Sequence, residues 1–479
     1  MNFRLLCFTT GTMALLMLGV SALARATILS VAQDGSGQYA KIQSAIDAAS
    51  NGDTVLVADG TYSGPGNRDI DFHGKSLVVK SAHGPAKTIM DCGGYKSKDG
   101  SGNHRGFFLH SGEKKATITG FTIKNGCEID FPDPVSPNTG NVSPGFDRGG
   151  GVEFSDFLSG DPFGTLLLSD CIISGNTATY GGGVYNNNEW NQNGYGKHGG
   201  TITLTYCTIS GNTALFDEGS NQSEGGGIYN RNANGGEITL TDCTISENIA
   251  SAPSASGSTG GGVCNYNFND QTSGDKNVIE GGTITLTNCT ISKNHVFGES
   301  GGGGGIENVN LVALGKIALM NCAIFGNTAA GYGGGIYNGS ATGGNGGMVT
   351  LTQCTVSHNA ALRGGSGMYD SYFLHSGSVF TLTHCIFFGD KNDEIANDYA
   401  DTAGDYKFLY ALGVKDETIK HIPTLPIKIS VTSNDIQGGF TGVGNINADP
   451  LFADAAADDF HLKPSSLCLG MGAYGASKP

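Results

Sequence analysis

The amino-acid sequence predicts an all-β fold, a parallel β-helix solenoid of about ten to twelve turns. A unit of about 30 to 45 residues recurs along the chain without a helical period, which is typical of a solenoid. Its copies around Cys207, Cys243 and Cys289 are GGTITLTYCTISGNTA, GGEITLTDCTISENIA and GGTITLTNCTISKNHV. A glycine run and a short apolar strand follow each of them, as in GGGIYN at Tyr229 and GGGVCN at Cys264.

The first strand of the unit ends at a corner of fixed length. Ile202 and Leu204 alternate with threonines, so both point to one face of a strand. Cys207 follows Leu204 by three positions, which breaks the alternation and requires a corner that returns Cys207 to the interior. The same spacing recurs in Leu168/Cys171, Leu204/Cys207, Leu240/Cys243, Leu286/Cys289, Leu319/Cys322, Leu351/Cys354 and Leu382/Cys385. We therefore expect a corner without insertions.

The variable segments of the unit flank the strand that follows the glycine run. From Tyr229 to Cys243 the distance is 14 residues, and from Cys264 to Cys289 it is 25. From Cys171 to Tyr185 it is 14 residues, and from Cys207 to Tyr229 it is 22. We expect three short strands per turn, with loops of variable length on both sides of this one strand.

Stacked turns should produce ladders of like residues about 4.8 Å apart. Asparagine suits the turns because its amide can bond a stacked neighbour and because it tolerates a left-handed backbone. One predicted row is Asn176, Asn212, Asn248, Asn294, Asn327 and Asn359, and a second is Asn186, Asn230, Asn265, Asn308 and Asn338. The seven corner cysteines should form a buried ladder of thiols. Their spacing exceeds the Cβ separation of about 3.5 to 4.5 Å that a disulfide prefers, although some bridging stays an alternative.

Residues 1–26 are predicted to be a secretory signal peptide. Arg4 precedes an apolar run over 5–20, and Ala24-Arg25-Ala26 forms a small-residue cleavage site. A retained membrane anchor is the alternative, but the run is short for a span. The mature chain should have no transmembrane segment and should be secreted, periplasmic or held at the cell surface.

Residues 27–62 are predicted to cap the N-terminal end. They comprise a strand, an amphipathic helix with Ile42 and Ile46 on one face, and a strand ending in Gly60-Thr61-Tyr62. This segment resembles the opening of pectin methylesterases and of many right-handed β-helix proteins in the pectate-lyase-like superfamily. The resemblance implies a right-handed β-helix with an N-terminal capping helix.

The repeats should occupy residues 63–390, and residues 391–479 should hold a polar insertion, the last turns and a C-terminal cap. That terminal segment resembles the end of bacterial right-handed β-helix repeat proteins, which implies that it closes the second end. Residues 149–390 resemble the repeats of polymorphic outer-membrane proteins, which are adhesin-like. Those proteins end in a membrane β-barrel, whereas this chain ends in GAYGASKP without alternating amphipathic strands.

Charge and motifs narrow the function. A net charge of −16 disfavours nucleic acid or an anionic membrane as a partner, and a strongly anionic polysaccharide would need a bridging cation. The sequence lacks the Asp-Phe-x-Phe-Gly stretch of methylesterases and the Trp-Ile-Asp-His strand of pectate lyases. Its only Asp-Asp pair, Asp458-Asp459, lies near the terminus rather than at the mid-helix place that it has in polygalacturonases.

The strand after the glycine run supplies the candidate site. The residue after its buried apolar position should point outward, which gives the stripe Glu153, Tyr185, Tyr229, Cys264, Glu307, Tyr337 and Tyr369. Sugar rings stack on such tyrosines, and the predicted binding residues are Tyr185, Trp190, Tyr195, Tyr229, Arg231, Glu307, Tyr337 and Tyr369. The alternative is that stacked tyrosines only protect and rigidify a sheet face.

We therefore expect a non-catalytic protein that binds a polysaccharide, or a glycan or protein of a cell surface. The alternative is a polysaccharide lyase, esterase or hydrolase. Glu153 and Glu307 are four turns, roughly 19 Å, apart, which is too far for a glycosidase pair. A partner would have to come from a loop, and the sequence does not single one out among Glu189, Glu218, Glu224, Asp275 and Glu299. No CxxC or HExxH motif is present, so we expect no metal and no cofactor, with calcium in an acidic loop left open.

Overall fold

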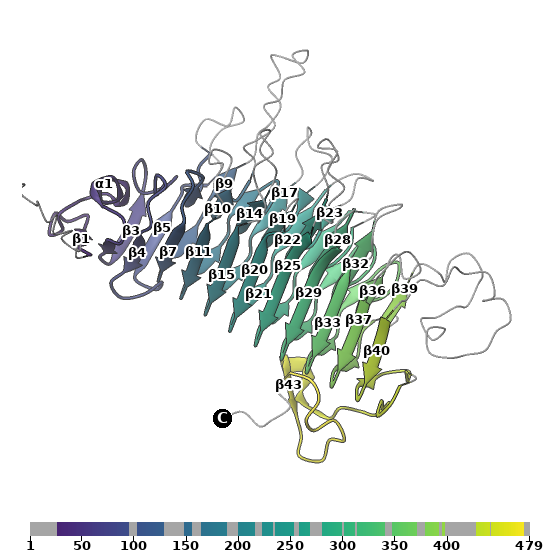
Figure 1. The fold of residues 1–479 in the computed structure, drawn as a ribbon. Coiled ribbons are helices and arrows are strands. Elements are labelled where there is room, and N and C mark those ends of the chain that lie inside the picture. The colour runs from purple at the N-terminus through teal and green to yellow at the C-terminus, as the bar shows by residue number, and fades with distance from the viewer. Residues whose placement is uncertain are drawn as a thin grey trace, which may run out of the picture.

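The computed structural model describes residues 26–94, 103–128, 148–155, 164–188, 200–215, 223–232, 235–252, 258–268, 280–298, 301–311, 314–340, 347–370, 379–391, 395–397, 428–440 and 442–473. These residues form a right-handed parallel β-helix, as predicted (Figure 1). The strands lie in four stacked sheets, here named A, B, C and D, and successive strands of each sheet pair in parallel. The signal peptide prediction concerns residues of which only Ala26 is described.

Sheet A has twelve strands, which agrees with the predicted number of turns. They are β1 (Ile28–Val31), β2 (Thr54–Val57), β4 (Val78–Ser81), β7 (Lys115–Thr119), β11 (Thr165–Ser169), β15 (Thr201–Thr205), β20 (Glu237–Thr241), β25 (Glu280–Thr287), β29 (Leu314–Met320), β33 (Met348–Thr352), β37 (Val379–Thr383) and β40 (Lys428–Thr432). Isoleucines and leucines at alternate positions, such as Ile202 and Leu204, point into the core.

Sheet B follows sheet A around the corner and has eleven strands. They are β3 (Gly60–Ser63), β5 (Thr88–Asp91), β8 (Thr122–Lys124), β12 (Ile172–Ser174), β16 (Thr208–Ser210), β21 (Thr244–Ser246), β26 (Thr290–Ser292), β30 (Ala323–Phe325), β34 (Thr355–Ser357), β38 (Ile386–Phe388) and β41 (Asp435–Ile436). From β11 to β38 two residues separate each sheet A strand from its sheet B strand, so the corner is invariant as expected.

The corner is invariant because its backbone is left-handed at one position. The residue before each corner cysteine has a positive φ, 53° at Tyr206 and 53° at Asp242. Each cysteine is buried, and its thiol donates to the carbonyl two residues earlier, at 3.4 Å in Cys207 and 3.2 Å in Cys243. An inserted residue would turn the cysteine out of the core. The seven corner cysteines are free thiols, so the predicted thiol ladder is confirmed without bridges between them.

Sheet D was not expected, because the sequence predicts three strands per turn and the structure has four. Its seven strands are β9 (Cys127–Glu128), β13 (Thr177–Ala178), β17 (Thr213–Leu215), β22 (Ile249–Ser251), β27 (His295–Phe297), β31 (Thr328–Ala329) and β35 (Ala360–Ala361). At two or three residues each, these strands are too short to show a period of two in the sequence.

Sheet C contains the strands that follow the glycine runs. Its nine strands are β6 (Phe107–Leu109), β10 (Val152–Ser155), β14 (Val184–Asn188), β19 (Ile228–Asn232), β24 (Val263–Asn267), β28 (Ile306–Asn310), β32 (Ile336–Ser340), β36 (Met368–Asp370) and β39 (Ile395–Asn397). Two short strands, β18 (Ser223–Glu224) and β23 (Ser258–Thr259), pair with each other outside the four sheets.

Both predicted asparagine ladders are present and buried. In the first, Nδ2 of Asn212 donates to Oδ1 of Asn248 at 3.0 Å, and Nδ2 of Asn248 donates to Oδ1 of Asn294 at 2.9 Å. In the second, Nδ2 of Asn230 donates to Oδ1 of Asn265 at 2.9 Å. Asp390 and Asp370 accept at the C-terminal ends of the two rows.

The two ends of the solenoid are finished differently. Helix α1 (Ile42–Ala48) buries Ile42, Ala45 and Ile46 against the first turns, which confirms the capping helix. At the other end β42 (Phe452–Asp454) and β43 (Asp459–Leu462) form an antiparallel hairpin. This hairpin lies beside the solenoid (Figure 1), where Phe460 packs on Phe325 of sheet B at 4.8 Å. The aromatic side chains of this hairpin are buried by the side of sheet B, and the C-terminal cap over residues 391–479 stays a prediction.

Candidate functional site

The outer face of sheet C carries the predicted stripe in register. Phe108, Glu153, Tyr185, Tyr229, Cys264, Glu307, Tyr337 and Tyr369 are successive Cα partners. Their neighbours Val184, Ile228 and Val263 belong to the interior core, whereas Tyr185, Tyr229 and Cys264 form a separate buried cluster outside it. The alternation of the strand was therefore predicted correctly.

The expectation that the stripe is exposed is wrong. Tyr185 is 0% exposed, Tyr229 1%, Glu307 2% and Tyr369 3%. A further layer of chain covers them, because the residues before each glycine run lie over sheet C. We name this layer the cover. It consists of Arg148, Tyr180, β18, β23, Gly302, Tyr332 and Gly364, which pair from turn to turn. Buried rings cannot present their faces to a sugar, so these tyrosines are not the floor of an open trough.

The glycine runs allow the cover to approach the sheet closely. Gly181, Gly225 and Gly260 have φ of 64°, 67° and 61°, and each turns the chain from the cover into its sheet C strand. A Cβ at Gly225 would lie 2.6 Å from the Cβ of Tyr229. Only glycine fits at this position, so the glycine runs allow the cover to pack directly on the tyrosines.

Part of the aromatic cluster reaches the surface. Tyr180, Tyr266 and Phe268 are half-buried, and they surround the buried Tyr229 and Tyr185. Ring centroids are 5.8 Å apart between Tyr180 and Tyr229, 6.2 Å between Tyr229 and Tyr266, and 5.9 Å between Tyr266 and Phe268. We name Tyr180, Tyr266 and Phe268, with the two arginines beside them, the aromatic patch.

Two half-buried arginines accompany these rings. The guanidinium of Arg231 lies 4.9 Å from the centroid of Phe268, and that of Arg148 lies 5.5 Å from the centroid of Tyr185. Arg231 and Tyr266 are register partners on adjacent strands. Each lies two positions beyond its residue of the buried stripe, Tyr229 or Cys264, and so on the same face of sheet C. The aromatic patch therefore combines aromatic rings, whose faces can stack on apolar surfaces, with guanidinium groups that can donate hydrogen bonds.

The predicted site residues divide into three groups. Tyr185, Tyr229, Tyr369 and Glu307 are buried, and Tyr337 and Arg231 are half-buried. Trp190 and Tyr195 lie outside the described residues. Sequence reasoning missed Tyr180, Tyr266 and Phe268. Tyr266 and Phe268 follow Cys264 by two and four positions, so strand alternation could have found them.

A second aromatic cluster lies farther along the same face. Tyr369 stacks on Tyr332 of the cover at 4.3 Å and on Tyr337 at 5.8 Å with an interplanar angle of 5°. Tyr332 and Tyr337 are half-buried. Tyr337 is three turns from Tyr229, or about 14 Å at the strand spacing of a sheet.

Two buried carboxyls separate the aromatic clusters. Burial raises the pKa of Glu307 well above its ordinary value, and the charge of Glu224 raises it further. Burial likewise raises the pKa of Glu224, against the opposing effects of Tyr229 and Arg231. Among the described residues, Oε2 of each carboxyl has no hydrogen-bond partner. Hydrogen bonds from Gly260 and Thr259 oppose the rise at Glu307, but burial is the larger effect at both carboxyls and favours their neutral forms.

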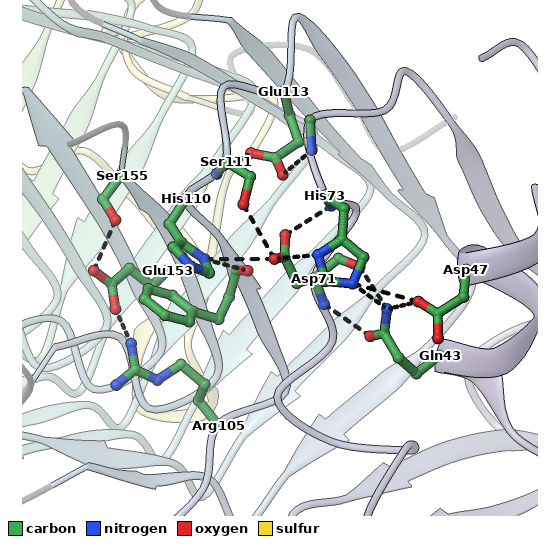
Figure 2. A network of polar contacts seen from close by, with 12 residues as sticks. Gln43, Asp47, Asp71, His73, Arg105, His110, Ser111, Glu113, Glu153 and Ser155 are labelled. Atoms are coloured by element: carbon green, nitrogen blue, oxygen red, sulfur yellow. Dashed lines mark hydrogen bonds and ion pairs between the residues drawn. The ribbon is translucent and has the colours of Figure 1, made fainter. Parts of the chain in front are cut away.

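The first turns of the same face carry a polar network (Figure 2). Arg105 forms a buried ion pair with Glu153, and Ser155 donates to Glu153 Oε1 at 2.9 Å. Burial raises the pKa of Glu153, and the Arg105 guanidinium opposes this rise. The guanidinium also lies 4.4 Å from the Phe108 ring centroid. Glu153 is 1% exposed, so its role is to fix Arg105 against the sheet.

Asp71 is the centre of the accessible part of this network (Figure 2). Its Oδ2 accepts from Ser111 Oγ at 3.1 Å and lies 2.8 Å from His73 Nδ1 and 3.9 Å from His110 Nδ1. Nε2 of His73 lies 3.3 Å from Asp47 of α1. Ser111 bonds the carboxylate rather than a histidine, so it lacks the base that a nucleophilic serine needs. The network ties the capping helix to the β-helix.

Across the described ranges no group of three or more His, Cys, Asp and Glu side chains is placed to hold a metal ion. In the same residues no helix is long and apolar enough to cross a membrane.

Comparisons with known proteins give likeness of fold. No protein-family model matches the chain, and curated proteins give no match in sequence. Pectate lyase Pel9A is similar in structure, with 13% identity and a TM-score of 0.48, covering 94% of this chain and 92% of that one. Pectin methylesterase from carrot has 12% identity and a TM-score of 0.36, covering 74% of this chain and 82% of that one. Pectin methylesterase from Aspergillus niger has 12% identity and a TM-score of 0.32, covering 82% of this chain and 92% of that one.

Proposed function

We propose that this protein is an exported β-helix protein that binds a glycan through the outer face of sheet C. The observation that carries the proposal is the aromatic patch. Tyr180, Tyr266 and Phe268 are partly exposed beside Arg148 and Arg231, and they pack around the buried Tyr185 and Tyr229. Aromatic faces bind the apolar faces of sugar rings, and guanidinium groups donate to hydroxyl or carboxylate oxygens.

The partner we propose is a polysaccharide or a glycan of a cell surface. The rigid solenoid fixes the aromatic patch and the cluster of Tyr332, Tyr337 and Tyr369 on one face, so an extended chain can contact both. The signal peptide and the adhesin-like repeats that the sequence suggests favour a secreted or surface location. Arg148 and Arg231 provide local positive charge in a chain of net charge −16, so a weakly acidic glycan is compatible.

A polysaccharide lyase, esterase or hydrolase is the second candidate, and one observation favours it. The charge of Glu224 acts on Glu307, so the structure brings Glu307 the carboxyl neighbour that a hydrolase would require. Both carboxyls are 2% exposed, however, and a catalytic pair must reach its substrate. Binding is therefore the function that the geometry supports better.

A glycan panel tests the proposal. The full chain, after removal of any signal peptide, is incubated with immobilised neutral and uronate polysaccharides, with and without calcium, and retention and chain ends are measured. We expect retention without new reducing or unsaturated ends. New chain ends would establish catalysis instead, and lack of retention on every glycan would refute the proposal.

A further inference from the structure

The cover buries several polar side-chain oxygens that have no hydrogen-bond partner among the described residues. Oε2 of Glu224, Oε2 of Glu307, and the side-chain oxygens of Ser223 and Thr179 are buried without a hydrogen-bond partner among the described residues. Burying such a group without a partner is unfavourable relative to solvating it. The closed arrangement over β19, β24 and β28 is therefore poorly compensated.

The middle of the cover is also weakly attached. β18 and β23 are two residues each and pair only with each other as strands. Their backbone links to the neighbouring turns include Gly181 N to Glu224 O at 2.9 Å, Glu224 N to Thr179 O at 3.3 Å, and Gly225 N to Thr259 O at 2.9 Å. Single bridges join Glu224 to Tyr180 and Thr259 to Gly302, and Thr259 and Gly260 also bond Glu307. All of these links are local to the cover and sheet C, so this segment can open without unfolding the solenoid.

What lies beneath is the buried part of the tyrosine layer. Thr259 contacts the Cys264 thiol at 3.6 Å, and Tyr229 bonds Glu224. Lifting β18 and β23 would expose Tyr229 and Cys264, which are 1% and 0% exposed when the cover is closed. It would also carry Glu224 into water and remove a covering segment from Glu307.

We propose that β18 and β23 form a lid that opens when Glu224 and Glu307 lose their protons, and that the open state adds the Tyr229 ring to the glycan-binding face. The ligand in this inference rests on the proposed function, but the movement of the lid does not.

The direction of the pH dependence follows from burial. A carboxyl that is buried in the closed state takes up a proton more readily there than in the open state, so the closed state is favoured at low pH. As the pH rises through the range set by the buried groups, the open population should grow about tenfold per pH unit for each carboxyl released.

The groups that face the two carboxyls agree with this direction. The titratable or charged groups on the packed elements are Tyr180 of the cover, Tyr185 of β14, Tyr229 and Arg231 of β19, Cys264 and Tyr266 of β24, His295 of β27, whose pKa burial lowers, and Tyr337 of β32. Arg231 is the one cation among them, and it favours ionisation of Glu224. Burial and the charge of Glu224 raise the pKa of Tyr229, and burial with the charges of Glu307 and Glu224 raises the pKa of Cys264, so both groups are favoured in their neutral forms.

Cys264 reports the opening directly, since it lies under the lid, whereas the corner cysteine Cys243 lies in the interior core. The native chain is treated with iodoacetamide from pH 5 to pH 8, and alkylation of Cys264 and Cys243 is measured by peptide mass spectrometry. The same series is run with the Glu224→Gln/Glu307→Gln variant and with Glu237→Gln, an exposed glutamate of sheet A. Alkylation rates of the three proteins are compared at equal pH. The increase in thiolate with pH is then common to all three series and does not account for a difference between them.

We expect the Cys264 rate of the native chain to exceed that of the double variant by about tenfold to a hundredfold at the upper end, and to match that of Glu237→Gln. Cys243 should stay unlabelled in all three proteins. Equal Cys264 rates in native chain and double variant at every pH would overturn the lid, as would labelling of Cys243 in parallel with Cys264. Hydrogen exchange at the Gly181 and Gly225 amides gives an independent readout that should show the same difference.

Glycan retention at pH 5 and pH 8 separates the two proposals. Gating of Cys264 without glycan retention at either pH would refute the proposed function and leave the lid intact. Retention without gating would refute the lid alone. With both correct, retention should strengthen with pH in the native chain and not in the double variant.

Discussion

Replacing Asn248 with alanine should destabilise the centre of the solenoid by about 4 kcal/mol. Oδ1 of Asn248 accepts from the backbone amide of Asn212 at 3.0 Å and from its side-chain amide at 3.0 Å. Nδ2 of Asn248 donates to Ile209 O at 2.9 Å and to Asn294 Oδ1 at 2.9 Å. All four bonds are lost, at about 1 kcal/mol net for each. Alanine leaves no group at this fully buried position that could replace them.

Hydrogen exchange is the appropriate assay, because a solenoid need not unfold in a single step. Loss of about 4 kcal/mol should speed exchange of the Asn212 amide and of the adjoining strands by up to about a thousandfold. The matched control is Asn288→Gly, which also removes two side-chain amide bonds, to Asp242 and Asn321, but at an exposed corner. Glycine is chosen there because Asn288 has a φ of 54°. The control should change stability by about 0.5 kcal/mol or less. Exchange at Asn212 that is no faster in Asn248→Ala than in the control would refute the role given to the ladder.

Three further predictions follow from buried groups. Glu307→Gln should raise the urea midpoint of unfolding at neutral pH, because burial raises the pKa of Glu307 in the folded state. The gain should vanish below a pH of about 4.3, the ordinary glutamate pKa, where the native carboxyl is protonated in the folded and unfolded states. A gain that persists at that pH would contradict the raised pKa. Arg105→Ala should cost about 3 to 5 kcal/mol at neutral pH by leaving Glu153 buried without its cation, and less at acid pH, as measured by urea unfolding; an equal loss at both pH values would show that lost packing dominates. Phe460→Ala should cost about 3 to 5 kcal/mol locally and release the β42–β43 hairpin from Phe325, so exchange should rise in the hairpin while the Asn248 amide stays protected.

The repeat made most of the fold predictable. The Leu-to-Cys spacing fixed the corner, and the structure explains it by the positive φ of residues such as Tyr206 and Asp242. The asparagine ladders were predicted because a stacked turn places like residues together, as Asn230 and Asn265 show. Sheet D was missed because strands of two or three residues leave no periodic signal.

The candidate site was predicted less completely, for a physical reason. Strand alternation says that Tyr229 points away from the core, which is correct, but it does not say what lies above it. The cover comes from residues before the glycine run, and its contact with Tyr229 depends on the left-handed turn at Gly225. The same alternation, extended two positions beyond Cys264, would have identified Tyr266 as a partly accessible ring of this face.

The most direct test of the account is the dissociation constant of the Tyr266→Ala/Phe268→Ala variant for a glycan that the native chain retains. Tyr206→Ala is the matched control, because Tyr206 is 67% exposed but lies at the corner between sheets A and B. Loss of two stacking rings should weaken binding by about tenfold or more, with the control unchanged. Equal affinity of the double variant and the native chain would contradict the claim that the outer face of sheet C is the binding surface.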